Sequence, residues 1–301
     1  MDSNVCVIIA AYNAEATIAR AVRSALAERE AVEVIVVDDA SSDNTINIAR
    51  SFDDGTGRLK ILTQPSNTGP ASARNRALAE SRSSWIAILD ADDFFLPGRI
   101  QGLLAHANGM DFIADDLWKV NENADEQHRS FLGITKPKTV SFSEFVQSNI
   151  PKPGRSEMGF LKPLMRRQFL DEHNIRYQEQ LRLGEDYELY ARALGSGAKF
   201  LLTPAQGYVA VTRQNSLSNR HSAMDLLHFR DCDKALLADL KLTKPERKIL
   251  RAHYTSVDCR LQWRLLISAV KNKNAIAAFR TFLRPFPVPV YLIRQLWRKI
   301  C

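Results

Sequence analysis

The densest group of chemically useful side chains in this sequence is the run Asp90-Ala91-Asp92-Asp93. It directly follows the apolar run 85–89, which has the composition of a buried strand. Three carboxylates held this close repel one another and lose hydration, and both effects oppose their ionisation. A bound divalent cation removes that cost, and oxygen ligands suit Mg²⁺ and Mn²⁺. The run therefore indicates a metal site for a phosphate-bearing substrate, with an acidic helix-capping turn as the alternative.

Polar residues of other types follow three more runs that we expect to be strands. Because ligands bind beyond the carboxyl ends of strands in open α/β sheets, these groups would converge on one crevice. Turn chemistry alone does not require such convergence, so the combination is stronger evidence than any one group. The three polar groups are Ala11-Tyr12-Asn13, the segment 38–45 and the segment 67–75.

The elements that would position these residues follow from the hydrophobic pattern. Continuous apolar runs alternate with amphipathic stretches over the first 120 residues, which predicts a mostly parallel α/β sheet. We expect a loop over 121–138 and only helices beyond about residue 221. The expected strands are 5–10, 32–37, 59–63, 85–89, 111–114, 200–202 and 208–212. The expected helices are 14–27, 43–51, 70–80, 96–106, 141–149, 164–173, 185–194, 226–242, 245–270 and 274–283.

The composition is that of a globular protein that works in a reducing compartment. Of the 301 residues, 45% are apolar and 25% are charged. The four cysteines are scattered and have no metal-type spacing. No signal peptide is expected, because Asp2 stands where a basic region would be, and no run of 18 apolar residues predicts a membrane span. We therefore expect a cytoplasmic location.

The net charge of +7 is unevenly distributed along the chain. Residues 241–301 contain 14 Lys and Arg against Glu246 and Asp258, a net charge of +12, so the first 240 residues carry −5. A basic segment of this kind either binds an anionic membrane surface or forms a solvated helical face. Nucleic-acid binding is disfavoured because no recognised binding module is present.

The order and spacing of these motifs resemble those of the inverting glycosyltransferases of family 2, which have the GT-A fold. The resemblance rests on the run 7–13, on Asp38-Asp39 with Ser41, Asp43 and Thr45, on 67–75 and on 90–93. Two later segments, 184–189 and 213–218, extend it to about 220 residues. It implies a catalytic domain over 1–220, with a nucleotide-sugar half (1–120) and an acceptor half (121–220), followed by a basic helical region over 221–301.

The resemblance also implies which residues bind the donor. Ala10 and Tyr12 would hold the nucleotide base, and Asp39 would accept the N3–H of uracil. Arg74 would reach the diphosphate, or alternatively bridge the acidic residues. Among the three carboxylates, Asp92 would ligate Mn²⁺ or Mg²⁺, Asp90 would contact the ribose or the metal, and Asp93 would cap the next helix.

The acceptor side of the expected site comes from the later motifs. Asp186 would be the general base that deprotonates the acceptor hydroxyl, and Glu185 would orient the acceptor. The alternative for this pair is a first helical turn stabilised by the helix dipole. Arg213 would lie on a segment that closes over the donor, and Lys162 is either a phosphate contact or a solvated helix position.

The family resemblance implies transfer of a hexose from a UDP-sugar, with UDP-glucose as the default, to a hydroxyl group. The acceptor would be a glycan on a lipid-linked polysaccharide intermediate, and the chain would bind peripherally to the inner face of the cytoplasmic membrane. One alternative is a sugar-nucleotide pyrophosphorylase, which would need a Gly-rich, Lys-containing loop that 10–14 does not supply. The non-enzyme alternatives are a regulatory domain with clustered aspartates and a sugar-binding relative without catalysis.

Overall fold

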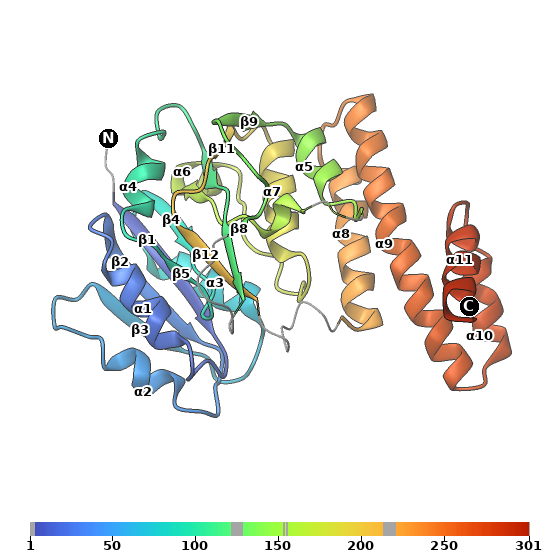
Figure 1. The fold of residues 1–301 in the computed structure, drawn as a ribbon, viewed down its shortest axis with the longest axis horizontal. Helices are drawn as coiled ribbons and strands as arrows, with labels where there is room; N and C mark the ends of the chain where they lie inside the picture. The colour runs from blue at the N-terminus through green and yellow to red at the C-terminus, as the bar shows by residue number, and fades with distance from the viewer. Residues whose placement is uncertain (1–3, 122–128, 153, 155, 213–220, 301) are drawn as a thin grey trace. The chain divides into compact units, whose positions relative to one another are not determined.

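The computed structural model describes residues 4–121, 129–152, 154, 156–212 and 221–300 (Figure 1). The chain divides into two compact units, which are described separately. The first comprises 1–141 and 158–214, and the second comprises 142–157 and 215–301.

The first unit is built on an eight-stranded sheet with the order β3-β2-β1-β4-β10-β6-β11-β9. The first four strands in this order are parallel, β10 is antiparallel to both its neighbours, and β6 and β11 are again parallel. The predicted α/β class with a mixed, mostly parallel sheet is therefore confirmed. The strands are β1 Val5–Ala11, β2 Ala31–Asp38, β3 Leu59–Thr63, β4 Trp85–Ile88, β6 Phe112–Asp115, β9 Lys138–Val140, β10 Leu164–Arg166 and β11 Phe200–Thr203.

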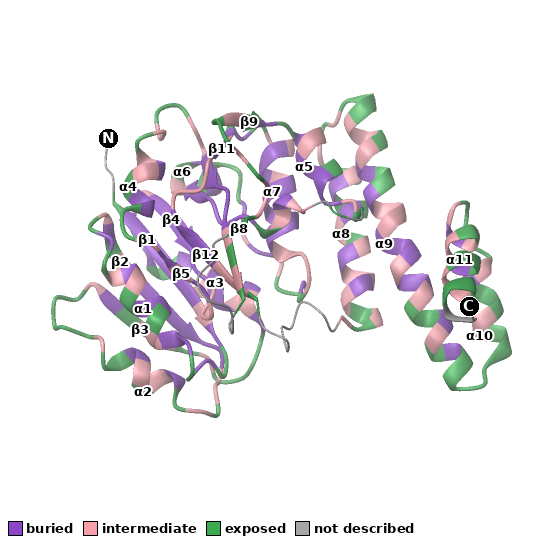
Figure 2. Ribbon diagram, viewed as in Figure 1, coloured by how far each residue is buried: buried purple, intermediate pink, exposed green. Residues whose placement is uncertain are grey.

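Helices pack on this sheet, and nearly all residues of its central strands are buried (Figure 2). Helices α1 and α3 both pack on β1 and β2, which explains why these strands are continuous apolar runs and not alternating ones. The helices of the unit are α1 Ile18–Leu26, α2 Thr45–Arg50, α3 Pro70–Glu80, α4 Arg99–Leu104, α6 Arg167–Glu172 and α7 Glu185–Gly195, with a 3₁₀ turn, η1, at Met158–Phe160.

A second, four-stranded sheet has the order β5-β12-β7-β8. Its strands are β5 Phe94–Phe95, β7 Trp118–Asn121, β8 Arg129–Ser130 and β12 Tyr208–Thr212. β12 is parallel to β7 and antiparallel to β5, so it lies beside the chain that directly follows the acidic run. Three of these strands, β5, β7 and β8, are too short for periodicity to reveal them, and the sequence does not predict them. The loop expected over 121–138 is therefore wrong at Arg129–Ser130, which pairs with β7 as a strand.

The strand directions decide which residues meet at the side of the main sheet where the parallel strands end, which we call the functional edge. The ends of β1 and β2 are in register, with Ala11 opposite Asp38, and β4 runs parallel beside β1. β10 runs the other way, so its amino end lies at the same edge as the carboxyl end of β4. The helix predicted over 164–173 is wrong in its first three residues, because Leu164–Arg166 pairs with β4 and β6 as a strand.

The second unit is helical, and its helices are α5 Phe142–Ser148, α8 Ala223–Asp239, α9 Lys244–Lys271, α10 Ala275–Phe282 and α11 Val288–Ile300. Both α8 and α9 begin with a capping box, which fixes where each helix starts. Between them, His253 Nδ1 lies 2.6 Å from Asp233 Oδ2 in a fully buried pair. In the described ranges, the structure contains no helix that is both long and apolar enough to cross a membrane.

Glu33 on β2 anchors the turn that leads from α3 into β4. Its Oε2 accepts hydrogen bonds from the hydroxyls of Ser81 (2.8 Å) and Ser83 (2.5 Å) and from the backbone N–H groups of Arg82 and Ser83. Desolvation raises the pKa of this carboxyl, but the hydrogen bonds from Ser83, Ser81 and Arg82 outweigh it and lower the pKa to about 2. The folded state therefore strongly favours the ionised form of Glu33.

We predict that Glu33→Gln lowers the free energy of unfolding at pH 7 by about 1–2 kcal/mol, because the pKa is depressed from 4.5 to about 2 and solvent screening reduces the corresponding free energy. The contribution of a depressed pKa is present above the unfolded-state value and is lost as pH falls towards the folded-state value. The difference between wild type and variant should therefore shrink between about pH 5 and pH 3, as measured by urea unfolding. The exposed Glu80→Gln serves as the control, and an E33Q effect that did not change with pH would contradict the assignment.

Candidate active site

Arg74 is the centre of the polar cluster at the functional edge of the sheet. It lies one turn inside α3 and is only 3% exposed, and its guanidinium stacks 5.3 Å from the Tyr177 ring. Its Nη2 donates to Asp90 (2.8 Å), and its Nη1 donates to Glu185 (2.9 Å) and Asp186 (3.3 Å). One guanidinium therefore joins the end of β4 to the first turn of α7.

Lys162 completes the cluster from the other side. Its Nζ lies 2.6 Å from Asp186 Oδ2 and 2.9 Å from Asp90 Oδ2, and the side chain is buried. The five side chains carry two positive and three negative charges, so the cluster has a net charge of −1 when all are ionised. Of the two predictions for Lys162, the solvated helix position is wrong, because the side chain is buried, lies outside any helix and pairs with two carboxylates. Contact with a phosphate stays a prediction.

The signal that would have revealed Lys162 is its position two residues before β10. The amino end of an antiparallel strand lies at the same edge as the carboxyl ends of its parallel neighbours, where the acidic residues are. The periodicity of 164–173 indicates a helix, and that reading concealed this topological relation.

The cluster controls the ionisation of its members. Desolvation raises the pKa of Asp90, but the charges of Lys162 and Arg74 outweigh it and lower the pKa to about 2. Burial tends to lower the pKa of Lys162, but Asp186 and Asp90 raise it well above its usual value. Glu185 differs, because burial and then the charge of Asp186 raise its pKa against the opposing effect of Arg74. Asp90 and Lys162 are therefore held in their charged forms.

The sequence predicts that Asp93 caps the next helix, and this prediction is wrong. Helix α4 begins after Gly98, whose φ of 82° lies in the left-handed region, and no side chain caps it. Asp93 instead accepts hydrogen bonds from the Tyr208 hydroxyl and the Val211 N–H, both at 2.8 Å. Burial, followed by the charges of Asp90 and Asp92, raises the pKa of Asp93 to about 8. Its role is to join the acidic run to β12.

Asp92 is the residue that the sequence predicts to ligate a metal. Its side chain is half-buried, and its backbone carbonyl accepts a hydrogen bond from Arg20 Nη2 (2.8 Å). Both oxygens of Asp90 lie within 2.9 Å of a cationic side chain. No group of three or more acidic, His or Cys residues in the described part of the chain is arranged to hold a metal. The carboxylates of Asp90 and Asp92 fit a divalent ion that takes few protein ligands and completes its shell with phosphate oxygens and water, as Mg²⁺ commonly does.

Asp39 is buried at the end of β2, and it organises the loop between β3 and α3. Its Oδ1 accepts from Gln64 Nε2 (2.9 Å) and the Thr68 N–H (2.8 Å), and its Oδ2 accepts from the Gly69 N–H (2.8 Å). Both oxygens therefore already have donors, and a uracil N3–H would have to share or replace one of them. Oδ1 of the neighbouring Asp38 is buried and has no hydrogen-bond partner among the described residues.

The other expected base-binding residues lie at the end of β1. Tyr12 is 48% exposed, and Ala10 is half-buried opposite Val37 of β2. Next to Tyr12, Asn13 has a φ of 48° and exchanges hydrogen bonds with Ser41 and Ser42. These bonds tie the loop after β1 to the loop after β2 and leave the ring of Tyr12 exposed to solvent. The expected site residue Arg213 lies outside the described residues.

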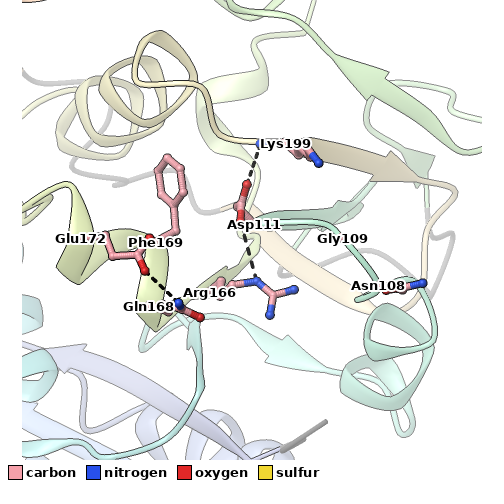
Figure 3. Close-up of a pocket in the computed structure, with 8 residues that line it drawn as sticks. All are labelled: Asn108, Gly109, Asp111, Arg166, Gln168, Phe169, Glu172 and Lys199. Carbon is pink, nitrogen blue, oxygen red and sulfur yellow. Dashed lines mark hydrogen bonds and ion pairs between the residues drawn. The ribbon is translucent and has the colours of Figure 1, made fainter.

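A cavity of about 440 Å³ lies at the opposite edge of the main sheet (Figure 3). It is lined by Asp111 and Lys199, which precede the parallel strands β6 and β11, and by Arg166 at the end of the antiparallel β10. The Arg166 guanidinium donates to the carbonyls of Ala107 and Met110 and stacks on Trp85, so it has a structural role. Because ligands of open α/β sheets bind at the carboxyl ends of the strands, we place the active site at the Arg74 cluster and not at this cavity.

Comparisons with known proteins identify the family of the chain. The sequence profile of glycosyl transferase family 2 matches residues 6–172, and the chain belongs to that family. It is 48% identical to the succinoglycan biosynthesis protein ExoU of Rhizobium meliloti strain 1021, over 90% of this chain and 80% of the relative. It is also 31% identical to the succinoglycan biosynthesis protein ExoO of the same organism, over 93% of this chain and 81% of the relative. The chain is thus a glycosyltransferase, and neither a pyrophosphorylase nor a regulatory domain.

A shorter match and two solved structures complete the comparison. Over 49% of this chain and 56% of the relative, the sequence is 31% identical to an Escherichia coli enzyme, the UDP-Glc:alpha-D-GlcNAc-diphosphoundecaprenol beta-1,3-glucosyltransferase WfgD. The structure of S. aureus TarS with UDP-GlcNAc superposes with a TM-score of 0.67 and 17% identity, covering 92% of this chain and 90% of that one. The structure of the mannosyltransferase PcManGT of Pyrobaculum calidifontis, with GDP-Man and Mn²⁺, superposes with a TM-score of 0.61 and 17% identity. This match covers 98% of this chain and 84% of that one. The fold is therefore the GT-A fold.

We predict that Lys162→Met lowers the free energy of unfolding by about 3–5 kcal/mol, because it leaves three clustered carboxylates with Arg74 as their one cation in the cluster. The double variant Lys162→Met/Asp186→Asn should recover about half of that loss, since it removes one of the uncompensated charges. Chemical denaturation at neutral pH measures both effects. The control is Lys199→Met, an exposed lysine at the other edge, which should change stability by less than about 0.5 kcal/mol. A double variant no more stable than the single one would show that Lys162 does not act by compensating charge.

Proposed function

We propose that this chain is an inverting glycosyltransferase of exopolysaccharide biosynthesis, which moves a hexose from a UDP-sugar to an acceptor hydroxyl. The observation that carries the proposal is the position of Asp186, which two buried cations hold at the carboxyl edge of the sheet beside the acidic run. Family membership and the similarity to ExoU support the same reading.

In the proposed reaction, Asp186 removes the proton of the acceptor hydroxyl as its oxygen attacks the anomeric carbon. The bond from that carbon to the donor phosphate breaks on the opposite face, and UDP leaves with the electron pair. Attack and departure on opposite faces invert the configuration, so an α-linked UDP-sugar gives a β-linked product. A single protein carboxylate is sufficient, because the leaving diphosphate is already a weak base.

Arg74 and Lys162 act on both the base and the leaving group in this proposal. Each contacts an oxygen of Asp186, which fixes the orientation of the carboxylate. The donor diphosphate offers the same two cations a second anion. The same two cations would therefore orient the base and bind the leaving diphosphate.

A divalent cation completes the proposed donor site, with Asp92 as its direct ligand and Asp90 close to it or to the ribose. When bound, Mn²⁺ or Mg²⁺ neutralises charge on the diphosphate and so helps UDP to leave. Support comes from the donor chemistry of the acidic run and from the presence of Mn²⁺ with a nucleotide sugar in the P. calidifontis structure. Tyr12, Ala10 and Asp39 would form the base-binding side of the site.

For the finer identity of the substrates we rely on the relatives. The name of WfgD specifies UDP-glucose and a diphosphoundecaprenol-linked acceptor, so we propose UDP-glucose and a lipid-linked glycan. Glu185 would orient that acceptor beside the base. Such an acceptor places the enzyme on the inner face of the cytoplasmic membrane. We further propose that residues 1–220 carry out the transfer and that residues 221–301 bind to the membrane surface.

We predict that Asp186→Asn lowers kcat by about 10²- to 10⁴-fold, because the amide cannot accept the proton of the acceptor. Binding of UDP, measured by calorimetry, should change much less, since the donor site keeps both cations. The assay is release of UDP from UDP-glucose with lipid extracts that contain diphosphate-linked glycans as acceptors. Asp111→Asn, an acidic residue at the opposite edge of the same sheet, is the control. Full activity of D186N beside an unaffected control would exclude Asp186 as the base.

We predict that Mn²⁺ tightens UDP-glucose binding to the wild type at least tenfold relative to EDTA, a gain of about 1.4 kcal/mol. Asp92→Asn should remove most of this gain, whereas it should leave binding in EDTA nearly unchanged. Calorimetric titrations with UDP-glucose, UDP-galactose, UDP-GlcNAc and GDP-mannose would test the metal and the donor together. If D92N kept the full effect of Mn²⁺, Asp92 would not be the ligand, and preference for GDP-mannose would overturn the proposed donor.

A further inference from the structure

Helices α10 and α11 of the second unit each have two apolar faces, and only one of them is used for packing. The inner face contributes Val288 and Leu292 to a buried cluster with Cys259 and Leu266 of α9. Partly buried residues of both helices, among them Phe282 and Leu296, pack against this cluster. The inner face is therefore sufficient to hold the two helices against α9.

The second apolar face is exposed to solvent, and we call it the outer face (Figure 2). Its helical members recur at intervals of three and four residues, which is the spacing of one helical face, and Leu283 and Phe286 lie in the connection between the two helices. Seven large apolar side chains exposed together are unusual on a soluble surface, and they mark an interaction site. The outer face consists of Ile276 (71% exposed), Phe279 (64%), Leu283 (65%), Phe286 (81%), Val290 (44%), Ile293 (51%) and Trp297 (67%).

Positive charge accompanies this face, since Arg280, Arg284, Arg294 and Arg298 each directly follow one of its residues. Residues 259–301 contain nine Lys and Arg and no acidic residue. The exposed residues Arg280, Arg294 and Arg298 have no carboxylate of the described chain within ion-pair distance, and Arg284 reaches only Asp258, at 3.8 Å. The rim of the outer face is thus a set of arginines whose charge is not compensated locally.

We propose that the outer face docks on an anionic lipid bilayer, with its apolar side chains in the boundary between headgroups and acyl chains. The arginines would then lie at the level of the lipid phosphates, which they can bind in a bidentate manner. Neither helix can span the bilayer: α11, the longer one, has 13 residues and a length of about 20 Å, against a hydrocarbon core of about 30 Å. The helices therefore lie in the interface.

Charge favours an anionic bilayer over a second copy of the chain as the partner of the outer face. Two copies that paired through their outer faces would bring their arginine rims together, and like charges across an interface oppose association. An anionic bilayer supplies both an apolar layer and the missing negative charge. The inference deepens the proposed function, whose lipid-linked acceptor gives the docking a purpose, but its test does not require sugar transfer.

The test is sedimentation of the full chain with sucrose-loaded vesicles of phosphatidylcholine, alone or with about 30% phosphatidylglycerol, at about 0.1 M salt. The wild type should bind the anionic vesicles at least tenfold more tightly than the neutral ones. The apolar variant Phe279→Ser/Phe286→Ser/Trp297→Ser and the charge variant Arg280→Gln/Arg294→Gln/Arg298→Gln should each weaken binding about 10²-fold.

Two control variants match these changes elsewhere in the second unit. Met224→Ser removes an exposed apolar side chain from α8, and Lys241→Gln/Lys244→Gln/Lys248→Gln removes the same charge at the start of α9. The controls should bind vesicles within about threefold of the wild type, because adjacent basic residues contribute only where they face the lipid. UDP binding should be unchanged in all variants, which separates failure of the docking surface from failure of the proposed transferase.

Equal vesicle binding by the wild type and both outer-face variants would overturn the proposal, as would wild-type binding that did not depend on lipid charge. Light scattering without lipid tests the competing occupant. A dimer that the apolar variant converted to a monomer would show that a second copy covers the outer face. Circular dichroism and thermal melts identical to those of the wild type would show that the variants remain folded.

Discussion

The buried cluster of Arg74 and Lys162 with three carboxylates is the constraint on which the active site depends. Each cation bridges Asp90 and Asp186, residues almost a hundred positions apart in the chain. Neither the cations nor the carboxylates could be buried alone, because isolated buried charges are very costly. The main sheet must therefore deliver all of them to one edge, and the antiparallel β10 is the element that does so for Lys162.

This arrangement gives the carboxylates different tasks. Asp90 is held ionised and faces two cations, and Asp93 is joined to β12 through Tyr208 and Val211. We propose Asp92 as the metal ligand. Asp186 shares its cations with Asp90, which couples the proposed base to the proposed phosphate site. The proposed catalytic groups and donor-binding groups therefore belong to one electrostatic unit.

The sequence predicts much of this, and its failures have physical causes. The apolar runs that became β1, β2, β3 and β4 are long and buried on both faces, so their pattern is clear. The acidic run and Glu185-Asp186 stand out because their residue types are rare beside buried elements. The strand β10 has only three residues, too few for periodicity to separate it from the helix that follows. Lys162 was not assigned to the site, and Asp93 was placed at the wrong element, because both depend on contacts between distant segments.

The second unit shows a different limit of sequence reading. Its helices are predictable, but the sequence does not reveal that α10 and α11 carry two apolar faces and that only the inner one packs on α9. Only the three-dimensional structure separates the inner face from the outer face, since both consist mainly of large apolar residues.

The configuration of the product tests the central claim most directly, because a single base opposite the leaving group allows only inversion. Proton NMR of the fresh product formed from UDP-α-glucose reads the configuration from the coupling of the anomeric proton. The account predicts a β linkage, with the large coupling of a diaxial proton pair. An α-linked product would contradict the role of Asp186 as the base of a direct displacement.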